Sequence, residues 1–232
     1  MSVSGLLVSV RSAEEAREAV LGGASVIDVK EPHRGPLGMA DPEVWQRVRD
    51  VVPSRIPVSV ALGDMRDWRA RPAPSRSAFA GIRFRKMGLA GEGAGWQERW
   101  SALRDAWGDG PTWVAVIYAD WERAKSPRPE AVIDLAAETA CAGVLIDTWD
   151  KSLPCPLDDS WMPIIRAIQN RVGLAVLAGG LDAEAIARMA HWAPDLFAAR
   201  GAACLGGDRL AAIDAQRVAA LARAASVVAS WS

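Results

Sequence analysis

The sequence predicts a single-domain (β/α)8 barrel, and the first observation behind this fold class is the number of its apolar segments. Eight short runs rich in aliphatic and β-branched residues recur along the chain, each of strand length. They cover residues 6–10, 26–30, 58–62, 82–86, 113–118, 143–147, 174–178 and 196–200. Runs of this length and composition, bounded by polar and turn-forming residues, are typical of buried strands.

The second observation is that helical patterns separate these strands. They occupy residues 13–21, 42–51, 95–107, 129–140, 163–172, 182–192 and 212–225. Ser12 and Asp182 precede two of them as N-cap residues. Strand and helix in alternation favour a parallel sheet, and eight repeats favour its closure into a barrel. An open doubly wound sheet is the alternative.

The third observation is the length of 232 residues, because eight βα units need roughly 200–250 residues. No internal linker divides the chain, so residues 1–232 are expected to form one domain. Residues 65–77 are rich in Arg, Pro and Ser and are expected to form an irregular loop or a short helix. Residues 226–232 are expected to be a loose tail.

The composition indicates which classes of partner and which cellular compartment to expect. The formal net charge is −1, whereas nucleic acid or an anionic membrane surface calls for a strongly basic face. No apolar run approaches the ~20 residues of a membrane helix, and the first ten residues lack the basic region of a signal peptide. The three cysteines, Cys141, Cys155 and Cys204, have no paired spacing, which fits a reducing compartment. We therefore expect a cytoplasmic protein that binds neither nucleic acid nor membrane.

Lysine is scarce in this chain. Of 27 basic side chains only four are lysine, namely Lys30, Lys86, Lys125 and Lys151. Arginine stays protonated in proteins, whereas lysine can become a neutral nucleophile or base. Lysines that remain in such an arginine-rich chain are therefore candidates for specific chemistry. Lys125 lies in a polar helix–loop stretch and is expected to be solvated.

The other three lysines lie where the active site of a barrel is built, at the carboxyl ends of the strands. Lys30 and Lys86 end the second and fourth predicted strands, and Lys151 follows the end of the sixth. Asp28 precedes Lys30 by two residues, so both side chains point to the same face. Asp147 ends the sixth strand. A dry pocket or a neighbouring cation lowers the pKa of an ammonium group, and the neutral amine can attack a carbonyl carbon.

Two further aspartates, Asp64 and Asp120, follow the third and fifth strands and are possible supporting residues. Charges also collect at strand ends simply because these are exposed, so each residue alone has this simpler interpretation. Convergence of scarce lysines with several aspartates favours a functional set, in which the carboxylates hold or transfer protons.

A phosphate site is expected in the loops after the seventh and eighth strands, where barrels often bind phosphate. The first loop contains Gly179 and Gly180, and the second contains Arg200, Gly201 and Ala202. Glycines let backbone N–H groups approach an anion, and an arginine adds a bidentate contact. Gly-Gly pairs also form ordinary turns. The two histidines, His33 and His191, are far apart in the sequence and predict no metal cluster.

At this point the sequence resembles a known family. Residues 28–38, D-V-K-E-P-H-R-G-P-L-G, resemble the D-V-K-x-P-x-x-G-x-L-G signature of the (5-formylfuran-3-yl)methyl phosphate synthase family, a barrel family of methanofuran biosynthesis. Matching motifs follow in order at residues 86–89, 118–120, 147–151, 177–179 and 200–209. Residues 65–77 depart from the family pattern, as do the arginines Arg83 and Arg85 of the fourth strand.

The resemblance implies condensation of two molecules of glyceraldehyde 3-phosphate to the furan aldehyde phosphate, with loss of phosphate and water. It implies a lysine Schiff base, no metal and no organic cofactor, and a host whose one-carbon metabolism uses methanofuran-type carriers. The residues that it implies as catalytic are Asp28, Lys30, Lys86, Asp147 and Lys151.

Some alternatives stay open at this stage. Another lysine-dependent aldolase acting on a small sugar phosphate would share every feature above, and a non-catalytic sugar-phosphate-binding barrel would share the phosphate loops. Lys30 is our choice for the imine, because it sits at a strand end beside Asp28. The order of the chemical steps stays open, and a homo-oligomer is possible.

Overall fold

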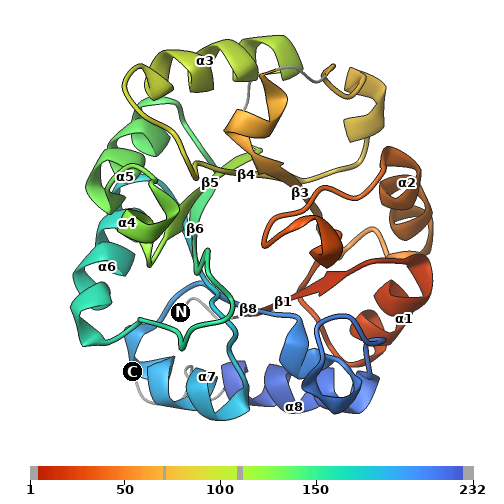
Figure 1. The fold of residues 1–232 in the computed structure, drawn as a ribbon. Coiled ribbons are helices and arrows are strands. Elements are labelled where there is room, and N and C mark those ends of the chain that lie inside the picture. The colour runs from red at the N-terminus through yellow and green to blue at the C-terminus, as the bar shows by residue number, and fades with distance from the viewer. Residues whose placement is uncertain (1–4, 70–71, 109–111, 227–232) are drawn as a thin grey trace.

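The computed structural model describes residues 5–69, 72–108 and 112–226. Eight parallel strands are paired in chain order, and β8 pairs with β1 to close the sheet (Figure 1). The predicted barrel is therefore confirmed, and the open doubly wound sheet is wrong. The strands are β1 (Gly5–Val10), β2 (Val26–Val29), β3 (Val58–Asp64), β4 (Phe84–Gly88), β5 (Trp113–Tyr118), β6 (Gly143–Asp147), β7 (Leu174–Leu177) and β8 (Leu196–Ala199).

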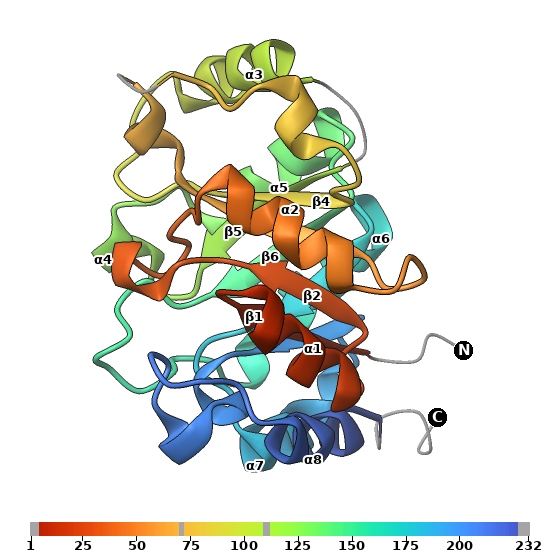
Figure 2. The ribbon, with the colours of Figure 1, turned by 90° about the vertical axis from the view of Figure 1, so that its right-hand side faces the viewer.

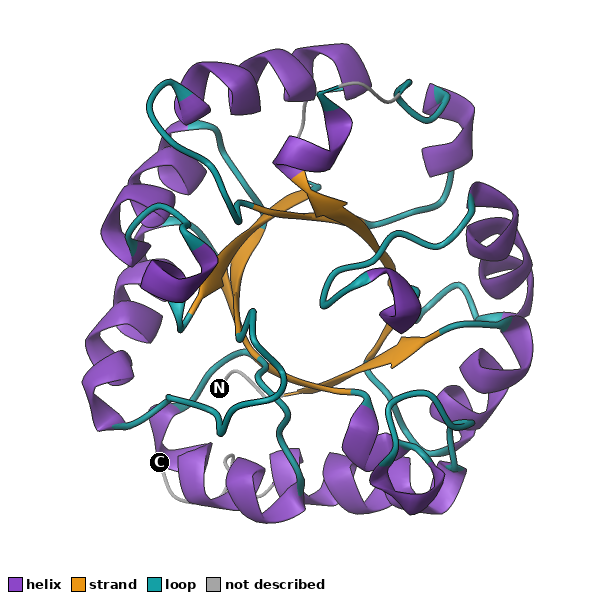
Figure 3. Ribbon diagram, in the orientation of Figure 1, coloured by secondary structure: helices purple, strands orange, loops and turns teal. Residues whose placement is uncertain are grey.

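Helices surround the barrel as an outer ring (Figure 3). They are α1 (Ala13–Leu21), α2 (Pro42–Val51), α3 (Trp96–Trp107), α4 (Trp121–Ala124), α5 (Pro129–Glu138), α6 (Met162–Arg171), α7 (Ala183–Met189) and α8 (Ala215–Ser226). Each predicted helical segment overlaps one of them, and the short α4 is additional. Ser12 and Asp182 cap α1 and α7 as predicted, because their side chains accept hydrogen bonds from the first-turn N–H groups. None of the helices in the described residues is long and apolar enough to cross a membrane.

The connection between β3 and β4 confirms the irregular segment predicted at residues 65–77. Two 3₁₀ turns, Met65–Trp68 and Arg76–Phe79, occupy the described part of this connection in place of an α-helix. Aromatic side chains cover this side of the barrel instead. The rings of Trp68 and Trp107 meet edge to face with centroids 4.4 Å apart, and the Arg85 guanidinium lies 4.2 Å from the centroid of the Phe79 ring. The unusual arginine of β4 is thus part of the packing.

The apolar side chains form two cores, one on each face of the sheet. Val8 and Ile27 belong to the large cluster between the barrel and its helices, whereas Leu7, Val26 and Leu145 belong to a smaller cluster inside the barrel. This division follows from the strand period of two, which sends alternate side chains to opposite faces. The inward-facing positions become polar toward the carboxyl ends of the strands, which lie on the side of α4 in Figure 2.

One strand boundary differs from its prediction in a way that matters for the site. β4 spans Phe84–Gly88 rather than residues 82–86, because the N–H of Ile82 bonds to Phe79 in the preceding turn. Lys86 therefore lies in the middle of β4 and is buried within the barrel. It does not lie at the strand end, where the sequence placed it.

Candidate active site

A cavity of about 620 Å³ opens at the carboxyl ends of the strands. Residues from β1, β4, β6 and β8 and from the segments that follow β2, β6, β7 and β8 line it. Its lining includes these residues of the predicted set: Lys30, Lys86, Asp147, Lys151, Gly179, Gly180, Arg200, Gly201 and Ala202. The structure thus brings the three chosen lysines and both predicted glycine-containing loops to one cavity.

Asp28 and Lys86 form an ion pair inside the barrel. The Lys86 Nζ atom lies 2.6 Å from Asp28 Oδ2, and both side chains are almost completely buried. The Ser9 hydroxyl donates to the same carboxylate oxygen at 3.0 Å, and the strand register places Ser9 directly beside Asp28. Oδ1 of Asp28 is buried and has no hydrogen-bond partner within the described part of the chain. The carboxylate is therefore held from one side only.

A second lysine–carboxylate pair lies at the end of β6. The Lys151 ammonium donates to Asp147 Oδ1 and to the Thr148 hydroxyl at 2.9 Å. Burial alone would raise the pKa of Asp147, but the charges of Lys151 and Lys30, together with hydrogen bonds, hold this pKa below its ordinary value. Asp147 is therefore ionised at neutral pH and keeps a proton-carrying group beside it.

Lys30 differs from the other two lysines because no carboxylate lies within ion-pair distance of it in the described residues. Burial lowers the pKa of Lys30 to about 7. The negative charges of Asp147 and Asp28 oppose this shift, and the positive charges of Lys86 and Lys151 add to it. Near neutral pH, Lys30 is accordingly a neutral amine in a large fraction of the molecules, and it lines the cavity.

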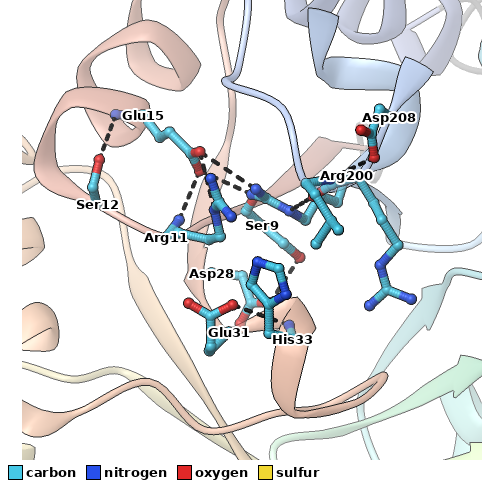
Figure 4. Close-up of polar contacts among 11 residues, drawn as sticks. Ser9, Arg11, Ser12, Glu15, Asp28, Glu31, His33, Arg200 and Asp208 are labelled. Atoms are coloured by element: carbon cyan, nitrogen blue, oxygen red, sulfur yellow. Dashed lines mark hydrogen bonds and ion pairs between the residues drawn. The ribbon is translucent and has the colours of Figure 1, made fainter. Parts of the chain in front are cut away.

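Arg200 lines the cavity, but its guanidinium is bonded to neighbouring segments of the barrel wall. Its Nη1 donates to the Ser9 carbonyl oxygen at 2.8 Å and to Glu15 at 2.9 Å. Its Nε donates to the carbonyl oxygen of Arg209 at 2.6 Å. Figure 4 shows the side chain directed at Glu15 and Ser9. The guanidinium that the sequence assigned to a phosphate is thus bonded elsewhere.

Backbone N–H groups remain available in both loops. Gly179 and Gly180 have positive φ angles of 121° and 77°, a conformation that glycine adopts without strain. Gly201 and Ala202 begin the 3₁₀ turn Gly201–Ala203. In the described residues none of these four N–H groups has a backbone acceptor. Groups of this kind can surround an anion.

Asp64 and Asp120 do not line the cavity. Asp64 Oδ1 accepts hydrogen bonds from the Tyr118 hydroxyl at 2.8 Å and from the Ala90 N–H at 3.0 Å. Burial raises the pKa of Asp64, and burial together with the Asp64 charge raises that of Tyr118. Asp120 accepts from the N–H groups of Trp149 and Asp150 at 2.7 and 2.9 Å. It therefore holds the loop that carries Lys151.

Some residues of the cavity were missed by the sequence reasoning. They are Leu7, Ser9, Leu37, Leu145, Asp182, Ala198, Ala199 and Arg217, whereas Gly207, Asp208 and Arg209 belong to the predicted eighth-strand loop. Ser9 carries no signal in the sequence, because a serine in a strand is commonplace. Arg217 lies in the first turn of α8, shortly after the eighth-strand loop. This position in the sequence could have marked it as a residue of the predicted phosphate site. His33 is exposed, and its backbone N–H donates to Glu31 (Figure 4).

The donor set of the site also bears on metal binding. In the described residues no group of three His, Cys, Asp or Glu side chains is arranged to hold a metal ion. Two of the three lysines that line the cavity, Lys86 and Lys151, are instead each paired with a single carboxylate. This set suits proton transfer and amine chemistry.

The chain was compared with solved structures. It superposes on phosphoribosyl anthranilate isomerase from Thermus thermophilus with a TM-score of 0.63 and 14% identity, covering 97% of this chain and 99% of that one. It superposes on a 3-hexulose-6-phosphate synthase with a TM-score of 0.60 and 19% identity, covering 95% and 99%. At these identities the likeness shows the fold alone.

Sequence comparison goes further. The family model described as 4-HFC-P synthase matches residues 6–222. A (5-formylfuran-3-yl)methyl phosphate synthase of Methanococcus maripaludis is 32% identical over 217 residues, which covers 88% of this chain and 91% of that protein. The protein of the same name from Methanopyrus kandleri is 35% identical over 216 residues, with 88% and 91% coverage. With a match over nearly its whole length and relatives of this identity, the chain belongs to the 4-HFC-P synthase family of enzymes.

Proposed function

We propose that the protein is a (5-formylfuran-3-yl)methyl phosphate synthase that joins two molecules of glyceraldehyde 3-phosphate by lysine Schiff-base chemistry, with loss of phosphate and water. The names of its relatives support the product. The observation that carries the mechanism is Lys30, an amine with a pKa of about 7 in a cavity that also holds two lysine–carboxylate pairs.

Lys30 is proposed as the nucleophile. Its neutral amine adds to the aldehyde carbon of one substrate molecule, and loss of water leaves an imine. The imine acidifies the adjacent C–H bond, and removal of that proton gives an enamine. The enamine can attack the aldehyde carbon of the second molecule, or expel the phosphate from the carbon β to the imine. Both steps use the same electron sink, and hydrolysis or cyclisation releases the amine.

The other two lysines are proposed as proton carriers. Lys86 forms an ion pair with Asp28, and the Lys151 ammonium donates to Asp147, so each pair places an ammonium proton beside a carboxylate. Loss of phosphate and of water both require protonation of a leaving oxygen, and general acids supply this. The Lys151 pair reaches the cavity from a loop, and the Lys86 pair lies deeper in the barrel.

Substrate phosphate is proposed to bind to the backbone N–H groups of Gly179, Gly180, Gly201 and Ala202. These groups line the cavity, and they lack backbone acceptors in the described residues. Barrels often bind phosphate in the same two loops.

The test is to incubate the purified protein with glyceraldehyde 3-phosphate alone. A furan chromophore together with released phosphate is the expected result. Borohydride added during turnover should trap an adduct on Lys30, located by peptide mass analysis. A different aldol product would establish another lysine-dependent aldolase, and binding without turnover would establish a non-catalytic barrel. Either outcome would contradict the proposed synthase.

A further inference from the structure

Arg200 connects three other segments of the chain at the point where the barrel closes. Its guanidinium donates to the Ser9 carbonyl on β1, to the Glu15 carboxylate on α1 and to the Arg209 carbonyl in the loop before α8. The Arg200 side chain is 4% exposed. A guanidinium has five N–H donors in a fixed plane, so it can donate hydrogen bonds to three separate acceptors at once. A lysine ammonium on a flexible stem cannot reproduce this geometry.

Glu15 is the buried counter-charge of Arg200, and it is itself held firmly. Its Oε2 accepts from the backbone N–H of Arg11 at 2.7 Å, and its backbone N–H donates to the Ser12 hydroxyl at 3.2 Å. Glu15 therefore lies at a defined position in the first turn of α1. Figure 4 shows the Ser12 contact at the Glu15 backbone N–H, and the contacts of Arg11 and Arg200 at its carboxylate.

The contacts of Arg200 continue to the buried pair of the proposed active site. Arg200 donates to the Ser9 carbonyl, and the Ser9 hydroxyl donates to Asp28 Oδ2, which also forms an ion pair with Lys86. These residues lie on or directly after neighbouring strands, β8, β1, β2 and β4, with β3 between the last two. One chain of polar contacts thus runs from α1 to Lys86.

Arg200 also borders the backbone that faces the cavity. Gly201 and Ala202 follow it directly, and Gly207, Asp208 and Arg209 form the returning loop that Arg200 holds through the Arg209 carbonyl. Moving the Arg200 side chain would therefore shift these amides and the Ser9–Asp28 contact together. Displacements of about 1 Å are enough to cost a large factor in rate.

We propose that Glu15 and Arg200 are positioning residues, which hold the Gly201–Ala202 amides and the Ser9–Asp28–Lys86 contacts in place without contacting the substrate. The part of this proposal that concerns catalysis rests on the proposed function. The part that concerns phosphate binding does not, because inorganic phosphate can be used as the probe. Direct phosphate binding by Arg200 makes the opposite prediction, since removing the charge of Glu15 would free the guanidinium for the anion.

The test is a double-mutant cycle of Glu15→Gln, Arg200→Gln and the double variant. The Kd of inorganic phosphate is measured by calorimetry, and KM and kcat are measured with glyceraldehyde 3-phosphate. We expect each single variant to weaken phosphate binding by about tenfold and to lower kcat, and the double variant to be no worse than either, since the two act as one unit. Glu184→Gln is the control, because its ion pair with Arg188 is exposed on α7 and should leave every constant unchanged.

Circular dichroism and thermal unfolding separate positioning from loss of folding. Should either glutamine variant unfold, Arg200→Lys keeps the charge, and the proposal expects weaker phosphate binding from it as well. Tighter phosphate binding by Glu15→Gln would overturn the proposal in favour of a direct ligand. Lower thermal stability with unchanged Kd, KM and kcat would overturn it in favour of a merely structural pair.

The same measurements keep the two proposals apart. Wild-type protein that binds phosphate but does not convert glyceraldehyde 3-phosphate would contradict the proposed function, and the phosphate cycle would still decide the roles of Glu15 and Arg200. Wild-type protein that binds no phosphate would overturn the positioning role.

Discussion

Lys86 Nζ lies 2.6 Å from Asp28 Oδ2 inside the barrel, although β3 separates their two strands in the sheet. The contact crosses the interior, and the side chains around it are mainly small or aliphatic. A charge in such surroundings is tolerated only beside an opposite charge and hydrogen-bond donors. We therefore expect a change in this pair to affect both the stability of the barrel and the proposed chemistry.

Asp28→Asn should destabilise the protein strongly, because it leaves the Lys86 ammonium buried without its counter-charge. Breaking a buried pair by removing one partner typically costs about 3–5 kcal/mol. Urea unfolding followed by fluorescence measures the change. The double variant Asp28→Leu/Lys86→Met should recover much of this loss, since it removes both charges. A single variant as stable as the wild type would show that the pair is not buried in solution.

Lys30, Lys86 and Lys151 should not tolerate replacement by arginine, although the chain uses arginine almost everywhere else. Arginine keeps the positive charge but cannot lose its proton at neutral pH. Each replacement should lower kcat by on the order of 10²-fold or more while the protein stays folded. Lys125→Arg is the matched control, because Lys125 does not line the cavity, and its rate should stay unchanged. Full activity of Lys30→Arg would refute the Schiff-base scheme.

Formation of the imine should depend on pH with a midpoint near the Lys30 pKa of about 7. Only the neutral amine attacks, so the rate should rise as pH increases through this value and level off above it. A lysine with the ordinary pKa of about 10.4 would keep rising up to pH 10. The measurement is the rate of borohydride-trapped adduct formation between pH 5.5 and 9. A profile that falls across this range would contradict the assignment of Lys30.

Gly201→Val should raise KM for a phosphorylated substrate more than it lowers stability. A Cβ atom at this position would lie 3.2 Å from the Gly207 carbonyl oxygen, so the turn must shift and the amides move with it. We expect KM to rise by on the order of tenfold, the effect of losing one good hydrogen bond to a charged group. Gly93→Val is the control, because a Cβ there meets nothing within 4 Å. An unchanged KM would remove Gly201 from the phosphate site.

Activity should survive exhaustive chelation. The cavity presents lysine–carboxylate pairs, and the described residues hold no cluster of three side chains suited to a metal ion. Lysine chemistry supplies its own electron sink and needs no Lewis acid. The measurement is product formation after dialysis against a strong chelator. Loss of activity that Mg²⁺ or Zn²⁺ restores would favour metal-polarised aldol chemistry instead.

Much of the site followed from local pattern. The spacing of Asp28 and Lys30 predicted two charged groups at the end of one strand, and Lys30 directly follows β2. The scarcity of lysine singled out Lys30, Lys86 and Lys151, all of which line the cavity. Asp64 and Asp120 carried the same signal but do not line the cavity, and they bond to Tyr118 and to the loop after β6. Position at a strand end does not determine which groups a carboxylate contacts.

The sequence by itself determined the eight strands, the helices between them and the family, because hydrophobic period and motif order are local properties of the chain. Only the tertiary structure decided which of the charged groups meet. Closure of the barrel brought Arg200 to Ser9 and Glu15, more than 180 residues away in the chain, and bonded its guanidinium to both. Such contacts depend on barrel closure, strand register and side-chain rotamers together, and none of these can be read from the spacing of residues along the chain.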